Sequence, residues 1–393
     1  MEILYIACGS GSDSTIGGSL ARTFEVSRRI AINYRVGFLT TSGGRAAIGK
    51  AFPAHSFFEI KTFISNYAAG LKYFLKQLFS YFQVFLGCFS LIPMIPCYSL
   101  IYTDTDGPWD ILPAIFYKYL HHDTKWIAMV HHMVTLRKDN PQVLIFSLIN
   151  IVMQKSCFLF IGRFADAIFV LDTSTGAGIK NYLAKKGCRK EFYSVRNGID
   201  IKMLKSVPEE EKKYDACFFG FLRPSKGLYD IVPIWRRVCN KNPEAKLLII
   251  GGMLQIYREF LDKEMARNNL KNNVILTDYI GDKSQAIKLM KQSRIFISPS
   301  QEEGWGITIM ECLACGLPGV IWNLPSYEKI LKGGVIKVPF GRVDKFADEI
   351  ENLLRDETLL AKFTCESVKA VSEYDWGNIA AQDANIMNEI IGI

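Results

Sequence analysis

The fold is decided by the stretch Ser298-Pro-Ser-Gln-Glu-Glu-Gly-Trp-Gly-Ile-Thr-Ile-Met-Glu311. It follows an apolar strand predicted over residues 295–297, and a helix is predicted to begin near Ile307. A strand, a glycine turn and a helix in this order place unpaired backbone N–H groups at the turn, where they favour phosphate. The stretch therefore predicts the ligand-binding edge of a parallel α/β sheet.

Two glutamates bracket this turn, with seven residues between them. We expect Glu303, in the loop, to accept hydrogen bonds from sugar hydroxyls, and Glu311, in the early turns of the helix, to accept them from ribose hydroxyls. Gly304 and Gly306 let the backbone approach a ligand closely. Thr308 is a candidate hydroxyl donor to phosphate, and local capping of the helix is the alternative role for it.

The alternation of strands and helices predicts an α/β fold with two Rossmann-like doubly wound domains facing a cleft. A strand, a glycine- and serine-rich stretch and a helix are expected over residues 3–7, 8–18 and 19–30. The same order restarts after the charged segment 208–213. Further strands are predicted over residues 35–40 (ending at the turn Ser42-Gly43-Gly44), 99–102, 125–130, 214–219 and 245–250, and a further helix over 228–240.

Chain length agrees with two domains. The chain has 393 residues, and single hydrophobic cores stop growing at roughly 250–300 residues. The charged segment is typical of a linker, so the first domain is predicted to cover residues 1–205 and the second residues 206–374.

Composition excludes several classes of function. Hydrophobic residues make up 49% of the chain and charged residues 22%, which is ordinary for a folded protein and argues against disorder. The net charge of +8 is compatible with anionic substrates, phosphates or acidic membrane surfaces. No basic run reaches the density of a nucleic-acid-binding motif, so we expect no nucleic-acid partner.

The cysteines indicate a reducing compartment. Ten of them are scattered along the chain, and no secretory signal pattern opens it, so a cytoplasmic location is the simpler expectation. Cys312 and Cys315 form a C-x-x-C pair, but no second pair stands at zinc-like spacing. We therefore predict packed thiols on a helix and expect no metal there.

An uncharged stretch covers residues 78–103 and is long enough to be considered as a transmembrane helix. A glycine and two prolines interrupt it, so a buried helix, a turn and a short strand account for it without lipid. Basic residues precede or flank this aromatic-rich region, at Lys61, Lys72 and Lys76. A peripheral contact with the inner face of the membrane is therefore a further hypothesis.

The stretch quoted above resembles the E-x7-E signature of retaining glycosyltransferases of the GT-B fold, particularly family 4, in the form S-x-x-E-G-[aromatic]-G. Other motifs of that family occur in the same order, and the match spans nearly the whole chain. These motifs are Gly17-Gly18 with Leu20-Ala21, Asn197-Gly198-Ile199-Asp200, Gly220-Phe-Leu-Arg-Pro-Ser-Lys-Gly227 and Cys315-Gly316-Leu317-Pro318.

The resemblance implies roles for particular residues. Arg223 and Lys226 would neutralise a leaving diphosphate without a metal or any other cofactor, and Glu303 would act beside them. His131, at the end of a predicted strand, would hydrogen-bond the donor sugar or a backbone group that positions it. The donor-binding residues that the resemblance implies are Gly17, Gly18, Gly304, Trp305, Gly306, Ile307, Thr308 and Glu311.

The resemblance also implies an activity. It predicts transfer of a sugar, with retention of the anomeric configuration, from a nucleotide diphosphate sugar such as a UDP- or GDP-sugar to a hydroxyl of a glycan or lipid-linked acceptor. The second domain would bind the donor and the first domain the acceptor. A helix over about residues 375–393 would pack back on the first domain, with Trp376 as a packing anchor.

The sequence is also compatible with other functions. The chain is also compatible with a noncatalytic sugar-nucleotide-binding subunit of a glycosyltransferase complex, or with a phosphorylase-like protein that needs a pyridoxal-phosphate lysine. Asp104-Thr105-Asp106 imitates a metal-binding D-x-D motif, but its place far upstream favours a loop at a strand end. Gly9-Ser-Gly11 lacks the third glycine of a dinucleotide fingerprint, because Ser14 occupies that position.

Overall fold

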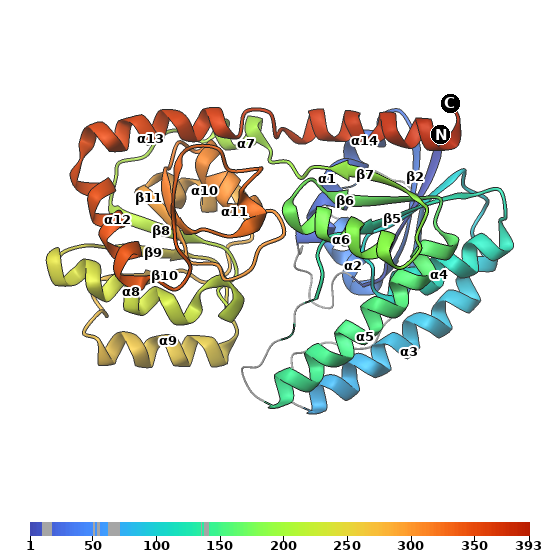
Figure 1. Ribbon diagram of the computed structural model, residues 1–393, viewed down its shortest axis with the longest axis horizontal. Helices are drawn as coiled ribbons and strands as arrows, with labels where there is room; N and C mark the ends of the chain where they lie inside the picture. Colours follow the sequence, from blue (N-terminus) through green and yellow to red (C-terminus); the bar gives the residue numbers. More distant parts are fainter. Residues whose placement is uncertain (10–17, 50–51, 53–55, 62–70, 135, 137–140) are drawn as a thin grey trace. The chain divides into compact units, whose positions relative to one another are not determined.

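The computed structural model describes residues 1–9, 18–49, 52, 56–61, 71–134, 136 and 141–393. The chain forms two compact units, of which the first contains residues 1–197 and 376–393 and the second contains residues 198–375. Each unit has a parallel sheet of its own with helices packed on it (Figure 1). The prediction of two Rossmann-like α/β domains is confirmed.

The sheet of the first unit has the strand order β3-β2-β1-β4-β5-β6-β7 over the described residues, and all its pairings are parallel. The order reverses between β1 and β4, which makes a topological switch point. Its strands are β1 (Glu2–Ala7), β2 (Arg35–Thr41), β3 (Ser56–Ile60), β4 (Leu100–Thr103), β5 (Lys125–Val130), β6 (Ala167–Leu171) and β7 (Glu191–Val195). Its helices are α1 (Gly18–Ile30), α2 (Ser42–Gly49), α3 (Leu71–Leu91), η1 (Ile92–Met94), α4 (Pro108–Leu120), α5 (Pro141–Phe164), α6 (Ser174–Lys185) and α14 (Trp376–Ile391).

The second unit repeats this plan with the order β10-β9-β8-β11-β12-β13 over the described residues, again all parallel. Its switch point lies between β8 and β11. The strands are β8 (Tyr214–Phe219), β9 (Leu247–Ile250), β10 (Val274–Leu276), β11 (Ser293–Ser298), β12 (Gly319–Trp322) and β13 (Val335–Val338). The helices are α7 (Ile201–Ser206), η2 (Pro224–Lys226), α8 (Leu228–Lys241), α9 (Gln255–Arg267), α10 (Lys283–Lys291), α11 (Ile307–Ala314), η3 (Pro325–Tyr327), α12 (Val343–Arg355) and α13 (Glu357–Ala370).

Hydrophobic spacing explains how these helices pack on their sheets. In α8 the buried residues Leu228, Ile231, Trp235 and Val238 recur every three or four positions, which places them on one face of the helix. The central strands are apolar on both faces, and every residue of β6 is buried. A sheet covered by helices on both faces requires this continuous apolar pattern.

The C-terminal helix α14 packs against α1 in the first unit. Arg22 of α1 and Asp383 of α14 form a buried ion pair, with 2.6 Å between Nη2 and Oδ2. Arg22 also donates to the hydroxyl of Tyr102 at 3.2 Å. Trp376, at the start of α14, is buried. The ion pair therefore ties the end of the chain to its first helix.

The charged segment 208–213 lies within the second unit and packs on it. The chain divides between Asn197 and Gly198, ahead of the boundary at residue 205 that the sequence suggested. Beyond the division, the Nζ atom of Lys291 donates to the backbone oxygen of Val207 at 2.7 Å and lies 3.0 Å from a carboxylate oxygen of Glu209. The segment is therefore part of the second unit, held to it by Lys291, and is not a free linker.

The turn predicted at Ser42-Gly43-Gly44 is wrong, because α2 begins at Ser42. The Oγ1 atom of Thr41 accepts a hydrogen bond from the backbone N–H of Gly44 at 3.3 Å. A hydroxyl at this position satisfies one of the unpaired N–H groups of a helix start. This hydrogen bond from Thr41 helps to stabilise a first helical turn that contains Gly43 and Gly44.

The uncharged stretch 78–103 forms a helix, a turn and a strand, as predicted, in α3, η1 and β4. None of the helices that the structure describes combines the length and the hydropathy needed to cross a membrane. The expectation that the helix is buried is wrong for one of its faces. Val84 and Cys88 are buried, whereas Phe79 and Phe82 are more than half exposed.

Candidate functional site

The turn after β11 has the geometry that the sequence predicted. β11 ends at Ser298 and α11 begins at Ile307. Gly306 caps the helix with a φ of 84°, a left-handed conformation that favours glycine. A Cβ atom on Gly306 would lie 3.3 Å from the side chains of Ile309 and Tyr327. The glycine therefore permits both the turn and its close packing.

Two predicted site residues form an ion pair beside this turn. The Nζ atom of Lys226, in η2, lies 2.5 Å from Oε1 of Glu303. The Glu303 side chain is 8% exposed and the Lys226 side chain 25%. Their loops are joined through the backbone, because the N–H of Gln301 donates to the oxygen of Ser225 at 3.0 Å. Residues far apart in the sequence are thus brought together at the ends of β8 and β11, which are paired strands.

Glycines bring these two loops close. Gly227 follows η2 with a φ of 87°, and a Cβ atom there would lie 2.3 Å from the backbone oxygen of Pro299. Gly220, at the end of β8, has a φ of 139°, and a Cβ atom there would lie 3.8 Å from Cγ2 of Thr308. Thr308 is therefore near the end of β8. Arg223 caps η2 and is exposed.

A second ion pair holds the other glutamate of the motif. The Nζ atom of Lys283 lies 2.5 Å from Oε1 of Glu311, whose side chain is 7% exposed. Lys283 is the first residue of α10, where Asp282 caps the helix. Lys283 is not among the site residues predicted from the sequence. The capping aspartate marks the helix start, but no local signal marks the lysine as a partner of Glu311.

Tyr327 is a second residue that the sequence analysis missed. It is fully buried, and its ring packs beside Gly306. Its hydroxyl finds no hydrogen-bond partner among the residues that the structure describes. Burial raises the pKa of this hydroxyl well above its ordinary value, and the negative charge of Glu303 raises it further. A buried hydroxyl left without a partner costs about 1–3 kcal/mol, so the site has an unused donor.

Trp305 is a packing residue of this turn. Its side chain is buried, and its indole nitrogen lies 3.0 Å from Sδ of Met310. The ring also contacts Tyr374, with 5.8 Å between the centroids. The side chain is thereby committed to the core of the second unit. A donor-binding role of Trp305 would have to come from its backbone.

The C-x-x-C pair is buried as predicted. Cys312 lies in α11, and Cys315 caps its C-terminal end. Burial raises the pKa of the Cys315 thiol to about 12. Both thiols are therefore protonated and packed at neutral pH.

In the first unit, His131 follows β5 and is half-buried. Its Nε2 atom lies 2.9 Å from the backbone oxygen of Asp104. Because a carbonyl oxygen can only accept, Nε2 carries the hydrogen and Nδ1 presents a lone pair. Burial lowers the pKa of this imidazole to about 3, and the positive charge of Arg22 contributes. His131 is therefore a neutral group at physiological pH.

The carboxylates near His131 are engaged by the protein. Oδ1 of Asp104 accepts from Oγ1 of Thr23 at 2.5 Å, and Oδ2 of Asp106 accepts from Nε2 of Gln154 at 2.6 Å. Asp110 accepts from backbone N–H groups after β1 and β4, at Cys8 (2.7 Å) and Thr105 (2.9 Å). Burial raises the pKa of Asp110 to about 8, and the charge of Asp104 adds to the effect. These acids hold strand ends together.

Gly17 and Ser14 lie outside the described residues. Gly18 is the first residue of α1.

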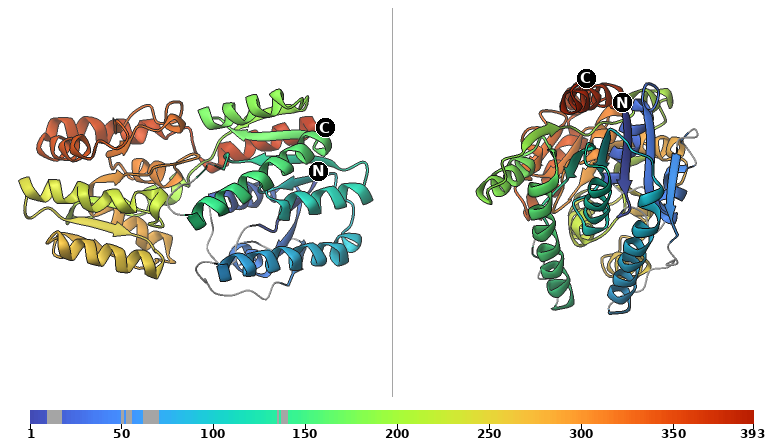
Figure 2. Two further views of the ribbon diagram at one scale, coloured as in Figure 1. Left: turned by 60° about the horizontal axis from the view of Figure 1, so that its bottom comes forward. Right: turned by 90° about the vertical axis from the view of Figure 1, so that its right-hand side faces the viewer.

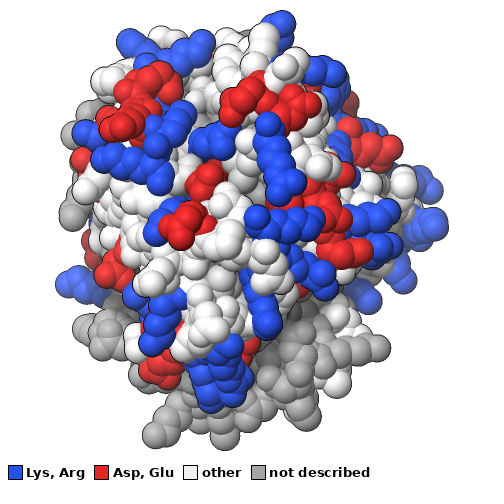
Figure 3. Space-filling view, turned by 90° about the vertical axis from the view of Figure 1, so that its left-hand side faces the viewer, with Lys and Arg blue, Asp and Glu red and all other residues white. Residues whose placement is uncertain are grey.

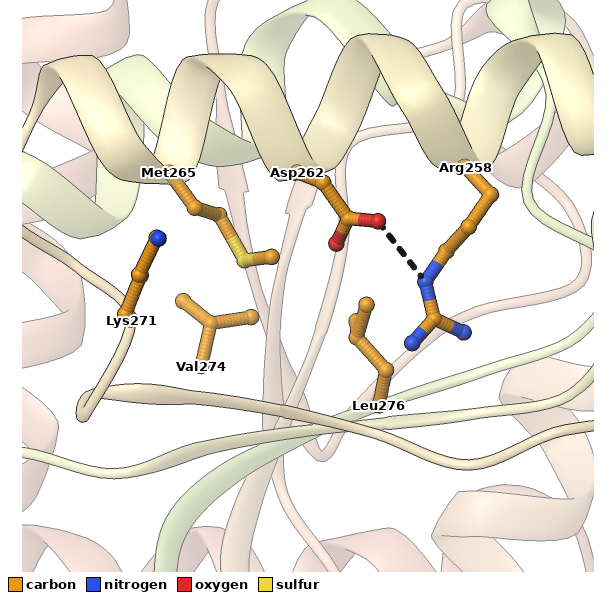
Figure 4. Close-up of a pocket in the computed structure, with 6 residues that line it drawn as sticks. All are labelled: Arg258, Asp262, Met265, Lys271, Val274 and Leu276. Atoms are coloured by element: carbon orange, nitrogen blue, oxygen red, sulfur yellow. Dashed lines mark hydrogen bonds and ion pairs between the residues drawn. The ribbon is translucent and has the colours of Figure 1, made fainter.

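A separate open pocket lies between α9 and β10 (Figure 4). Arg258 and Asp262 of α9 form an ion pair at 3.3 Å beside it. None of the predicted site residues contributes to its lining. The lining residues are Arg258, Asp262, Met265, Lys271, Val274 and Leu276.

Comparison with a protein family gives a match over most of the second unit. Residues 200–369 match the family described as glycosyl transferases group 1. The matched segment contains both ion pairs and the turn between the two glutamates.

Comparison with characterised proteins gives partial matches. The chain is 23% identical over 202 residues to the GDP-mannose:cellobiosyl-diphosphopolyprenol alpha-mannosyltransferase of Xanthomonas oryzae, covering 51% of this chain and 53% of that one. It is 27% identical over 236 residues to the poly(glycerol-phosphate) alpha-glucosyltransferase of Bacillus subtilis, covering 58% of this chain and 33% of that one. The chain thus spans about half the length of the Xanthomonas relative and a third of the Bacillus relative.

Solved structures show the same fold over the whole chain. The structure of Anabaena HepE in complex with UDP and glucose matches with a TM-score of 0.74 and 16% identity, covering 99% of this chain and all of that one. Sucrose-phosphate synthase from Thermosynechococcus elongatus matches with a TM-score of 0.74 and 14% identity, covering each chain completely. The GT-B fold that the sequence predicted is confirmed.

Proposed function

We propose, from the premise that residues 200–369 form a glycosyl transferases group 1 domain, that this chain transfers a sugar from a nucleotide diphosphate sugar to a hydroxyl acceptor. One observation carries the proposal. Lys226 with Glu303 and Lys283 with Glu311 pair at the carboxyl edge of the second sheet, on either side of a helix start. Cations, carboxylates and unpaired N–H groups are the groups that a diphosphate and two sugars require.

The cations provide the chemistry at the leaving group. Lys226 and the exposed Arg223 lie on the loop after β8, and Gly220 of that loop approaches Thr308 in the first turn of α11. Charge that develops on a departing diphosphate is stabilised by fixed cations and N–H groups, which need no reorganisation during the reaction. We propose that these groups replace a metal. The alternative of a phosphorylase-like enzyme would need a lysine bound to pyridoxal phosphate.

The glutamates hold the sugars. Glu303 would accept from hydroxyls of the transferred sugar, and Glu311 from hydroxyls of the ribose, each in exchange for its lysine partner. Such an exchange conserves charge-assisted hydrogen bonds on both sides. His131 of the first unit would accept a hydroxyl hydrogen at Nδ1 without carrying charge. We propose retention of configuration, as the family resemblance implies. Because the described carboxylates near His131 are bound to the protein, we propose that the leaving phosphate assists the incoming hydroxyl on the same face.

The donor and the acceptor are proposed from relatives. HepE was solved with UDP and glucose, and the Xanthomonas relative is named for GDP-mannose, so a UDP- or GDP-sugar fits this chain. Relatives are named for a diphosphopolyprenol, a poly(glycerol-phosphate) and a phosphatidyl-myo-inositol. We therefore propose a lipid-linked or glycan acceptor at the cytoplasmic face of a membrane.

A thermal-shift screen of UDP, GDP, ADP and their sugar conjugates tests the donor. A ligand that binds the folded state at 100 times its Kd stabilises it by about 2.7 kcal/mol, so one nucleotide series should raise Tm. Hydrolysis of the stabilising donor should follow. Binding without any hydrolysis or transfer would favour the alternative of a noncatalytic subunit, and the absence of binding would contradict both.

A further inference from the structure

The first unit carries two long helices that are apolar on the outside. α3, α4 and α5 pack side by side, since α4 contacts both of its neighbours. α3 has 21 residues and α5 has 24, whereas β4 has 4. At 1.5 Å per helical residue and about 3.3 Å per strand residue, both helices are more than twice as long as β4. Figure 2 shows the two helices projecting together beyond the sheet.

An apolar stripe runs along each of these helices. On α3, a row of aromatic and leucine side chains is 43–56% exposed, while Val84 and Cys88 face the core. On α5, a similar row is 41–64% exposed, while Phe158 and Ile161 are buried. The spacing of three or four residues places each row on one face. The exposed residues are Phe79, Phe82, Phe85, Leu86 and Phe89 on α3, and Ile145, Leu148, Val152, Leu159, Phe160 and Phe164 on α5.

The charged residues within α3 and α5 are all basic. The sequences of α3 and α5 contain Lys72, Lys76, Lys155 and Arg163 and no acidic residue. Lys155 and Arg163 are exposed and continue the row of Ile145, Val152 and Leu159 at helical spacing. On the face that Figure 3 shows, by contrast, basic and acidic side chains are mixed. The helix pair therefore differs from the ordinary surface in both hydropathy and charge.

We propose that the outer faces of α3 and α5 dock on a membrane surface that contains anionic lipids. Apolar side chains flanked by lysine and arginine are the composition that binds in the interface plane, with the apolar groups in the acyl boundary and the cations at phosphates. A second copy of this chain would bring the same cations and no acids on these helices, so two such faces repel each other. Docking here would bring the chain close to a membrane-linked acceptor, and this biological role rests on the proposed function. The docking itself does not, because it needs no sugar transfer.

Vesicle flotation without any sugar nucleotide tests the proposal. The full chain is mixed with vesicles of phosphatidylcholine alone or of phosphatidylcholine with an equal part of phosphatidylglycerol, at low and at high salt. We expect binding to the anionic vesicles that is at least about tenfold stronger than to neutral ones and that weakens with salt. Failure of the chain to float with anionic vesicles at low salt would overturn the proposal.

Matched variants locate the surface. Phe82→Ser with Phe89→Ser on α3, and Val152→Ser with Leu159→Ser on α5, should each reduce flotation at least about tenfold. The control is Ile256→Ser with Phe340→Ser, which removes apolar side chains of similar exposure, 63% and 56%, from the second unit. The control should float as the unmodified chain does. Equal losses in all three variants would contradict the assignment to these helices.

Two further measurements separate the possible failures. Lys155→Gln with Arg163→Gln should weaken binding to anionic vesicles and leave binding to neutral ones unchanged. Sedimentation of the chain without lipid should show a monomer. An oligomer that dissociates in the α3 and α5 variants would contradict the proposal, because it would mean that a second copy covers this surface. Donor-induced thermal shifts should be the same in all variants, so a loss of docking is distinguishable from a failure of the proposed transferase function.

Discussion

The carboxyl edges of the two sheets share a topology and differ in how they use charge. Both lie at a switch point of a parallel sheet. At the second edge, Lys226 and Glu303 pair with each other and keep part of the lysine exposed. At the first edge, Asp104 and Asp110 are buried and bound to the protein, and His131 is neutral. The same fold thus carries exposed ionic groups in the second unit and a neutral imidazole in the first.

This difference teaches that position in a fold does not set the chemistry of a site. An ionic edge suits a diphosphate, which carries charge of its own. A neutral edge suits sugar hydroxyls, because an uncharged imidazole can accept a hydrogen bond without attracting a competing anion. The following changes test whether charge serves catalysis at the second edge and structure at the first.

The largest effect is expected from the ion pair of the second unit. Lys226→Met or Glu303→Gln should lower kcat/KM for sugar transfer by a factor on the order of 100–1000, because transition-state charge loses a fixed partner. Initial rates with the donor found by thermal shift measure the effect. Glu302→Gln removes an exposed neighbouring carboxylate and serves as the control. Transfer within twofold of normal in both variants would remove the pair from the mechanism.

The next effect concerns the buried ion pair of the first unit. Asp383→Ala should lower the free energy of unfolding by about 3 kcal/mol, because Arg22 keeps a buried charge without a partner. Urea unfolding followed by circular dichroism measures it. Gln382→Ala, on an exposed position of the same helix, should change stability by less than about 0.5 kcal/mol. Equal stabilities of the two variants would show that this charge pair does not hold α14.

A smaller effect is expected at the unused hydroxyl of the second unit. Tyr327→Phe should reduce kcat/KM about tenfold if the hydroxyl donates to the bound donor, which corresponds to about 1.4 kcal/mol. Tm should not fall, since no described residue accepts from this hydroxyl. Tyr5→Phe removes a similarly unpaired hydroxyl from β1 and should leave transfer unchanged. A lower Tm with unchanged kinetics would assign Tyr327 a structural role instead.

The smallest effect is a pH dependence at the first edge. The pKa of His131 is about 3 in the folded state, and an unfolded histidine titrates near 6.5. As pH falls below about 6.5 the unfolded state takes up a proton and the folded state does not, so stability decreases until pH approaches 3. This group should remove at most about 1 kcal/mol between pH 6.5 and 5.5. The loss should be absent in His131→Gln, measured by urea unfolding at both values. An unchanged pH dependence in that variant would mean that other groups cause it.

Much of the fold could be predicted because its signals are local. The strands over residues 125–130 and 214–219 have the predicted bounds, since apolar runs are bounded by polar and glycine residues. The start of α11 follows from Gly306. The partner of Glu311 could not be predicted, because Lys283 comes from another helix. The burial of Tyr327 is likewise set by packing against Gly306, which no spacing in the sequence encodes.

The return of α14 to the first unit has a consequence for biosynthesis. The ribosome translates all of residues 198–375 before it reaches this helix. Arg22 therefore has no Asp383 to pair with until the whole second unit has been synthesised. Domains generally fold in the order of their synthesis. Here the first unit can complete its packing only after the whole of the second unit has been synthesised.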